Sequence, residues 1–247
     1  MSLNRALVQH LVELRKRLLL ALASVIFCFV SLVYFANHIY QLLASPLMRY
    51  LPAGTSMIAT DVATPFFTPI KLTLFCAVAL SVPMILYQLW QFIAPGLKRQ
   101  ERNLFAPMLL SGSLLFYLGI SFAYMVVLPA AFSFFTATTP QGVTMATDIS
   151  SYLDFVLALF MAFGLAFEIP ILVFLLCKLG LCEVSDLTKA RPHVVVASFV
   201  LGMLLTPPDI ISQTLLAIPM CLLFELGILA SRCWINTTPE HTAKLSI

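Results

Sequence analysis

Long apolar runs dominate the chain, and short polar segments separate them. A helix needs about 20 apolar residues to cross about 30 Å of hydrocarbon, so each long run predicts a membrane-spanning helix. Four runs qualify, at residues 18–34, 70–93, 104–127 and 152–177. The pattern predicts an all-α integral membrane protein.

The last apolar stretch, residues 194–230, is different because Thr206, two prolines and Asp209 interrupt it. Its first limb, residues 194–205, covers only about 18 Å as a helix. Either this limb crosses a locally thinned bilayer as a fifth span, with residues 210–230 as the sixth, or the pair forms a re-entrant hairpin. Both alternatives return the chain to the side from which it started. We prefer six spans, of which the fifth and sixth are short.

Composition agrees with this pattern, because 61% of the residues are hydrophobic and only 10% are charged. A soluble chain is about 45–50% apolar and about 25% charged, so lipid must solvate the surplus. The net charge of +3 is too small to indicate nucleic-acid binding. The six cysteines lie in or beside apolar runs and are interpreted as small hydrophobic residues. The four histidines are scattered, so no metal site or other cofactor is expected.

Basic residues fix the orientation, because twelve of the 14 fall on one side of the predicted spans. Those twelve are Arg5, Arg15, Lys16, Arg17, Lys98, Arg99, Arg102, Lys178, Lys189, Arg191, Arg232 and Lys244. Only Arg49 and the boundary residue Lys71 fall on the other side. An excess of Lys and Arg marks cytoplasmic segments, so both termini are predicted to be cytoplasmic. The proline-rich outer segments, residues 37–69 and 128–151, are expected to form compact caps.

Two isolated carboxylates lie in basic surroundings on the predicted cytoplasmic face. The first 17 residues form an amphipathic segment that is expected to lie along the cytoplasmic interface, and Glu13 is its only acid. Glu101 is likewise the only acid in the loop of residues 94–103. Either each carboxylate pairs internally, Glu13 with Arg17 one turn away, or both receive cationic groups from a partner. Arginine would then be favoured, because its planar fork can bind a carboxylate through two hydrogen bonds.

Glu168 lies deep in the fourth predicted span, where a charged carboxylate costs about 2.5–3.5 kcal/mol. It is therefore protonated and hydrogen-bonded within the bundle, exposed to water, or in contact with a partner. Pro170 cannot donate a backbone hydrogen bond, so the helix is expected to bend beside the carboxylate. Asp154 shares its helical face. The two acids suggest a rival function, a proton- or cation-coupled secondary transporter, although no internal repeat supports it.

The last span carries three further polar residues. Asp209 follows Pro208 and is most simply explained as a helix N-cap. Gln213 lies inside the membrane one turn later and needs a hydrogen-bond partner from this bundle or from another helix. Glu225 lies near the cytoplasmic end, and the sequence does not decide between an internal pairing and a partner contact.

Four segments in this order resemble the TatC family, the multispanning receptor subunit of the twin-arginine, Sec-independent protein translocase. They are residues 10–18, residues 92–97 with Glu101 and Arg102, residues 163–170, and residues 206–209 with Gln213. The resemblance covers most of the chain, as one membrane domain of residues 1–247. It implies a cupped bundle of six helices in the bacterial inner membrane, with Glu168 on its concave face.

The resemblance also implies a non-enzymatic function. Glu13 and Glu101 would bind the consecutive arginines of a signal peptide, beside an apolar rim shaped by Phe92 and the neighbouring turn of Pro95 and Gly96. Arg17 would also belong to this peptide-binding site. The last two spans, with Thr206, Asp209, Gln213 and Glu225, and the acidic face around Glu168 would dock single-span partners of the TatA and TatB type. Self-association is also expected. The assembly would export folded proteins, driven by the proton gradient. A membrane scaffold without ligand recognition is the least specific alternative.

Overall fold

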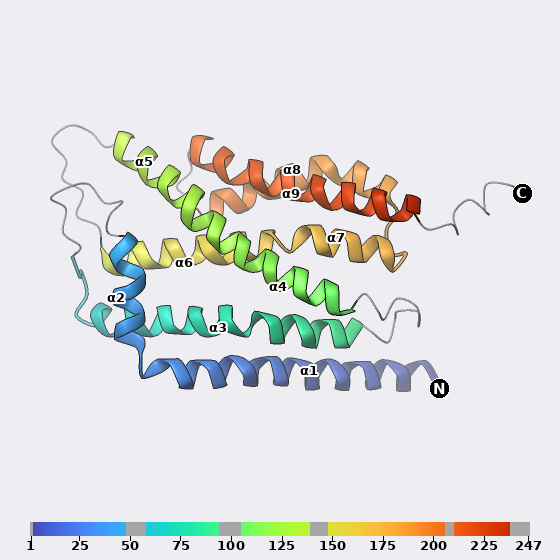
Figure 1. Ribbon diagram of the computed structural model, residues 1–247, viewed down its shortest axis with the longest axis horizontal. Coiled ribbons are helices and arrows are strands. Elements are labelled where there is room, and N and C mark those ends of the chain that lie inside the picture. The colour runs from blue at the N-terminus through green and yellow to red at the C-terminus, as the bar shows by residue number, and fades with distance from the viewer. Residues whose placement is uncertain (1, 48–57, 94–104, 139–147, 206–209, 238–247) are drawn as a thin grey trace, which may run out of the picture. The chain divides into compact units, whose positions relative to one another are not determined.

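The computed structural model describes residues 2–47, 58–93, 105–138, 148–205 and 210–237, and these residues are almost entirely helical (Figure 1). The helices are α1 (Ser2–Val33), α2 (Ala36–Leu47), α3 (Thr64–Ile93), α4 (Phe105–Phe122), the π-helical turn η4 (Ala123–Val127), α5 (Leu128–Thr138), α6 (Ile149–Ala166), α7 (Ile169–Lys178), α8 (Val184–Leu205) and α9 (Ile210–Thr237). Outside the helices, Ile58 and Asp148 form an isolated parallel bridge.

Five segments are long and apolar enough to cross a membrane, which confirms an all-helical membrane protein. They are Val8–Val33, Thr64–Ile93, Ala106–Phe134, Ile149–Lys178 and Gln213–Cys233. The predicted fifth span is not among them, because α8 carries Asp186, Lys189 and Arg191 in its first half. The count of six spans and the cytoplasmic placement of both termini therefore stay predictions.

The N-terminal segment and the first span form one helix. α1 runs from Ser2 to Val33 without interruption, and Figure 1 shows no bend where an interfacial segment of residues 1–17 was expected to end. Val8–Val33 of this helix is long and apolar enough to cross a membrane. The leucine, arginine, lysine and alanine residues in and after the basic cluster all favour helix, so nothing in this sequence ends the helix there.

The third predicted span is longer than expected. Helix continues through η4 and α5 to Thr138, so the prediction that a cap begins at residue 128 was wrong for its first part. Pro129 has no N–H group, and its ring would clash with the carbonyl one turn earlier in a regular α-helix. The wider π turn precedes it, with the Leu128 N–H donating to the Ala123 carbonyl, and lets the helix continue.

The predicted bend in the fourth span is confirmed. α6 ends at Ala166, and α7 begins at Ile169, with Pro170 in its first turn. The Glu168 N–H donates to the Leu165 carbonyl at 3.1 Å in a tighter turn. Glu168 is thereby placed at the break.

α7 ends in a Schellman motif. The Leu181 N–H donates to the Leu176 carbonyl and the Gly180 N–H to the Cys177 carbonyl, both at 3.1 Å. Gly180 has φ of 68°, a conformation that glycine adopts without a Cβ clash. α8 then begins at Val184, so the 12-residue limb predicted at residues 194–205 is only its second half.

The chain forms two compact units. The first comprises residues 1–114 and 132–157, and the second comprises residues 115–131 and 158–247. In the first unit, α1 and α2 pack on α3, which buries Leu72, Ala77 and Trp90. In the second unit, α7 and α8 pack on α9 around Val173, Leu187, Phe224 and Ile228.

Candidate functional site

A narrow groove of about 110 Å³ lies between α1 and α3 in the first unit. Its lining is apolar except for one arginine and one glutamine: Leu14, Arg17, Leu18 and Ala21 from α1, and Ile85, Gln88, Leu89 and Phe92 from α3. Both helices contribute residues spaced three or four apart, which share one helical face. The groove is a consequence of α1 packing along α3.

Arg17 is the only cation in this lining, and it contacts both helices. Its Nη2 lies 3.4 Å from Glu13 Oε1, and its Nη1 donates to Gln88 Oε1 at 3.3 Å. Gln88 is only 4% exposed. The Nε of Arg17 is buried and has no hydrogen-bond partner among the residues that the structure describes. The guanidinium group is therefore held by two long contacts and is not saturated.

The aromatic end of the groove is formed by two helices. The His10 ring of α1 stacks on the Phe92 ring of α3, with centroids 4.4 Å apart. Glu13 lies one turn after His10 and keeps 34% of its side chain exposed. The structure thus brings together three of the predicted residues, Glu13, Arg17 and Phe92, while Glu101 and Pro95 lie outside the described residues.

Glu168 has an unsatisfied carboxylate oxygen. Its Oε1 is buried without a hydrogen-bond partner in the described part of the chain, and its side chain does not cap α7. Just before Glu168 in the sequence, α6 and the turn after it pack on α4 through aromatic rings, with the ring of Phe122 5.7 Å from those of both Phe163 and Phe167. A group in this position gains from any hydrogen-bond donor that reaches it.

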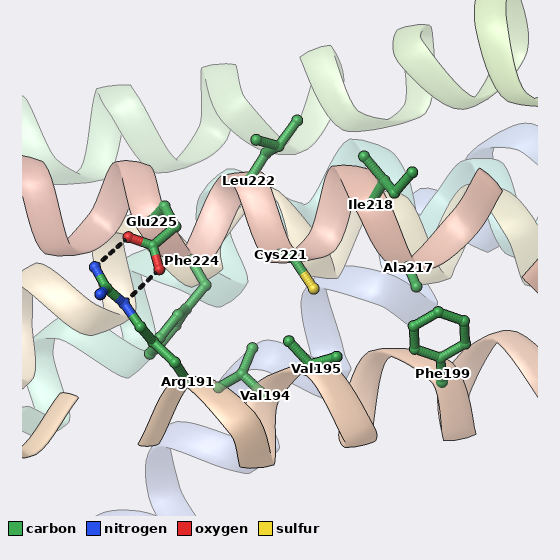
Figure 2. Close-up of a pocket in the computed structure, with 10 residues that line it drawn as sticks. All are labelled: Arg191, Val194, Val195, Phe199, Ala217, Ile218, Cys221, Leu222, Phe224 and Glu225. Carbon is green, nitrogen blue, oxygen red and sulfur yellow. Dashed lines mark hydrogen bonds and ion pairs between the residues drawn. The ribbon is translucent and has the colours of Figure 1, made fainter. Parts of the chain in front are cut away.

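A second, larger groove of about 310 Å³ lies between α8 and α9 (Figure 2). Arg191 and Glu225 close one end, where Nε meets Oε1 at 2.7 Å and Nη2 donates to Oε2 at 2.7 Å. Glu225 is thus paired internally, which is one of the two alternatives that the sequence left open. Figure 2 shows Val195 and Phe199 of α8 facing α9 along the same groove.

Gln213 is half-buried where α8 and α9 come close together. A Cβ placed on Gly202 of α8 would lie 3.4 Å from the Gln213 Cα atom and from its carbonyl oxygen. The glycine therefore permits this close approach. Thr206 and Asp209, predicted at the turn between the two helices, lie outside the described residues.

Polar contacts also join segments of the first unit near the expected outer side. Asp148 accepts hydrogen bonds from the backbone N–H groups of Ser151 and Thr60 and from both of their hydroxyls, at 2.9–3.2 Å. The Ser151 and Thr60 N–H groups lower the pKa of Asp148 from 3.8 to about 2. Lys71 Nζ lies 2.9 Å from each oxygen of Asp154. Asp154, considered as a proton relay, is thus an ion-pair partner.

Sequence reasoning did not identify Gln88, His10 or Asp148 as site residues. Gln88 and Lys71 carried a usable signal, because a polar residue inside or at the edge of an apolar run needs a partner. For His10 and Asp148 nothing in the sequence names the partner across the chain. The described residues contain no group of three His, Cys, Asp or Glu side chains that could hold a metal ion.

Five membrane-length helices, unsatisfied polar groups within them and a cation-containing groove define a polytopic α-helical membrane protein. Residues 9–219 match the family model described as Sec-independent protein translocase protein (TatC). The chain belongs to the TatC family.

Individual TatC proteins are similar to this chain over almost its full length. The chain is 56% identical to the Sec-independent protein translocase protein TatC of Haemophilus influenzae over 98% of this chain and 94% of that protein. It is 59% identical to the TatC protein of Escherichia coli strain K12 over 94% and 90% of the two chains. A crystal structure of the twin arginine translocase receptor TatC superposes with a TM-score of 0.82 at 37% identity, covering 91% of this chain and 98% of that one.

Membership defines the general role of the chain. It is a multi-pass inner-membrane component of the Sec-independent protein translocase, in a family of non-enzymatic transport receptors that work in a complex with other subunits. This assignment does not support the rival interpretation, a cation-coupled secondary transporter using Glu168 and Asp154.

Proposed function

We propose that the chain is the subunit that binds twin-arginine signal peptides, and that Glu13 receives one of the arginines. The observation that carries this proposal is the position of Glu13 at the α1–α3 groove, where 34% of its side chain is exposed and its internal contact is a single 3.4 Å approach. Support also comes from the related crystal structure, which is described as a twin arginine translocase receptor.

The chemistry of the groove suits an arginine-containing peptide. A carboxylate binds a guanidinium group through two parallel hydrogen bonds of about 2.7–2.9 Å, and Glu13 has oxygens left for such a contact. The stacked rings of His10 and Phe92 provide an apolar surface beside it. Glu101 and Pro95 are proposed as further contacts on the basis of the resemblance alone.

A binding assay tests the role of Glu13. The purified chain in lipid nanodiscs is titrated with a fluorescent twin-arginine signal peptide, and Glu13→Gln is compared with the unchanged chain. Loss of a hydrogen-bonded charge pair costs about 1.5–3 kcal/mol, so we expect the dissociation constant to rise by about tenfold or more.

Glu183→Gln is the matched control, because Glu183 is an exposed carboxylate outside the groove. It removes the same charge and should leave the affinity unchanged. Equal affinities of Glu13→Gln and the unchanged chain would refute the proposed receptor site.

We also propose that α8 and α9 are the fifth and sixth spans and that both termini are cytoplasmic. α8 contains 22 residues, which is enough to cross a bilayer although its first half is polar. Reporter fusions after residue 183 and after residue 207 should report opposite sides of the membrane. The same side for both would favour the re-entrant hairpin.

The groove between α8 and α9 is our proposed docking site for single-span partners of the TatA and TatB type, with Gln213 and Glu168 as polar contacts. Four of its apolar side chains are exposed, namely Val195, Phe199, Ile218 and Leu222. A photo-crosslinker at Val195 should capture co-expressed partner helices, and one at Leu110, exposed on α4, should capture far less. Equal capture at both positions would refute this docking site. With these partners, the assembly would use the proton gradient to export folded proteins.

A further inference from the structure

Two arginine–glutamate pairs in this chain differ sharply in geometry. Arg191 and Glu225 meet through two contacts of 2.7 Å, the length of strong charge-assisted hydrogen bonds. Arg17 and Glu13 meet through one contact of 3.4 Å. Glu225 is therefore fully engaged, whereas Glu13 is engaged weakly enough for another cation to replace Arg17.

Arg17 is held in place independently of Glu13. Its Nη1 donates to Gln88 on α3, and 75% of its side chain is covered, since 25% is exposed. The stem lies among the apolar residues of the groove, as arginine stems commonly do. If Glu13 were taken by a ligand, Gln88 would still hold the guanidinium group nearby.

We propose that Arg17 is an internal competitor for Glu13, which sets how tightly an entering peptide can bind there. This inference rests on the proposed function, in which Glu13 receives an arginine of the signal peptide. In the empty receptor Arg17 neutralises Glu13. A ligand cation must displace it before forming its own pair.

The exchange explains why a cation with poor hydrogen-bond geometry would bind only weakly at Glu13. Glu13 loses one ion pair for each one it forms. The net gain in binding free energy therefore comes from hydrogen-bond geometry rather than from charge alone. A ligand arginine can form two short hydrogen bonds with Glu13 where Arg17 forms one long one. A lysine presents a compact ammonium group without this planar fork, so it gains little from displacing Arg17.

Gln88 then holds the displaced Arg17 side chain. With the ligand bound, Arg17 leaves Glu13 and keeps its hydrogen bond to Gln88, which limits the cost of the exchange. Without Gln88, a displaced Arg17 would remain in an apolar groove without a partner, and a half-buried cation in that state is costly. Gln88 therefore assists the ligand only as long as Arg17 is present.

The test compares two signal peptides, one with its two arginines and one with both replaced by lysine, on the full chain in nanodiscs. Arg17→Met keeps an apolar stem and removes the charge, and Arg17→Gln is measured beside it in case one variant does not fold. We expect both variants to bind each peptide about two- to tenfold more tightly. The preference for arginine should stay as it was, because the cost of displacing Arg17 is the same for both peptides.

Lys16→Met is the matched control, because Lys16 is an exposed cation on the same helix. It should leave both affinities nearly unchanged, which separates competition at Glu13 from the general attraction of the cytoplasmic face. Weaker binding of the arginine peptide to both Arg17 variants would overturn the proposal. An equal effect of Lys16→Met and Arg17→Met on the two affinities would overturn it as well.

Gln88→Leu provides a second, independent measurement. It should weaken binding of the arginine peptide in the unchanged chain and have no effect in the Arg17→Met background. An equal loss in both backgrounds would show that Gln88 contacts the peptide directly and would overturn its holding role.

The proposed function and this inference fail in different ways. If the unchanged chain binds neither peptide, or Glu13→Gln binds as well as the unchanged chain, the receptor proposal fails and the competitor with it. If binding depends on Glu13 but the Arg17 variants bind both peptides only as tightly as the unchanged chain does, only the internal competitor is overturned.

Discussion

Gly119 of α4 lies where that helix passes closest to α6, and an added methyl group has no room there. A Cβ at this position would lie 2.5 Å from the carbonyl oxygen of Phe163 and 3.0 Å from both its carbonyl carbon and Cγ of Phe167. Gly119→Ala is therefore predicted to force the two helices apart.

The size of the effect follows from which atom is in the way. A carbonyl oxygen within a helix cannot rotate away as a side chain can, so α4 must shift by several tenths of an ångström to reach ordinary contact distance. Overpacking of this kind costs about 1–3 kcal/mol. Gly164 offers a contrast, because its added Cβ would meet the Phe116 ring, at 2.7 Å from the nearest ring atom, and a smaller side chain at residue 116 would remove that clash.

Equilibrium unfolding in mixed micelles measures the cost. Gly119→Ala should lower the free energy of unfolding by about 1–3 kcal/mol, and Ser121→Ala, at an exposed site on the same helix, should change it by about 0.5 kcal/mol or less. Adding Phe116→Leu should recover part of the loss caused by Gly164→Ala, but none of the loss caused by Gly119→Ala. An unchanged free energy in Gly119→Ala would show that the helices are not packed as closely as described.

Three further predictions concern charge and helix geometry. Because hydrogen bonds lower the pKa of Asp148 to about 2, its ionised form stabilises the fold above pH about 4, and this contribution is lost as the pH falls through about 2. Asp148→Asn should therefore be less resistant to proteolysis than the unchanged chain at neutral pH but equally resistant near pH 2. Because 45% and 40% of the two side chains are exposed, Arg191→Met should leave Glu225 unpaired and lower the free energy of unfolding by only about 0.2–1 kcal/mol, part of which Glu225→Gln should restore in the double variant. Pro170→Ala restores a backbone hydrogen bond worth about 0.5–1.5 kcal/mol and should join α6 to α7, so that spin labels on these two helices move further apart.

The apolar pattern predicted the helices well because lipid imposes a length on each span. The second and fourth predicted spans end at Ile93 and Cys177, within one residue of the ends of α3 and α7. The bend was predictable for a similar reason, since Pro170 removes a backbone donor wherever it occurs in a helix. These features depend on local chemistry, which a single sequence contains.

Features in which neighbouring residues offset a local break in the helix pattern were not predictable from the sequence. Pro129 was taken as a sign of a loop, but the π turn before it absorbs the irregularity. α8 begins at Val184 rather than at residue 194 because Asp186 accepts a hydrogen bond from the Glu183 backbone and stabilises the first turn. Residues 206–209 fall outside the described part of the chain, so the turn predicted there stays a prediction.

The contacts of the candidate site were the least predictable, because each joins residues distant in sequence. Gln88 lies 71 residues from Arg17, and Asp148 lies 88 residues from Thr60. A sequence shows that such a residue needs a partner but not which partner it finds. Only the contact between Glu13 and Arg17, which lie one helical turn apart, was predictable from the sequence.

Glu225, Glu168 and Glu13 differ in how completely the protein satisfies them, and this difference indicates where a ligand can act. Glu225 is engaged by both nitrogens of a bidentate arginine, so a ligand would have to break two short contacts to reach it. Glu168 has a buried oxygen without a partner among the described residues, so it gains from any donor that approaches through the bundle. Glu13 is intermediate, because it is neutralised but by a contact that a better-placed guanidinium can replace. A receptor that must bind and release a peptide needs the intermediate case: a satisfied acid does not bind, and an unsatisfied one within a membrane is costly to maintain.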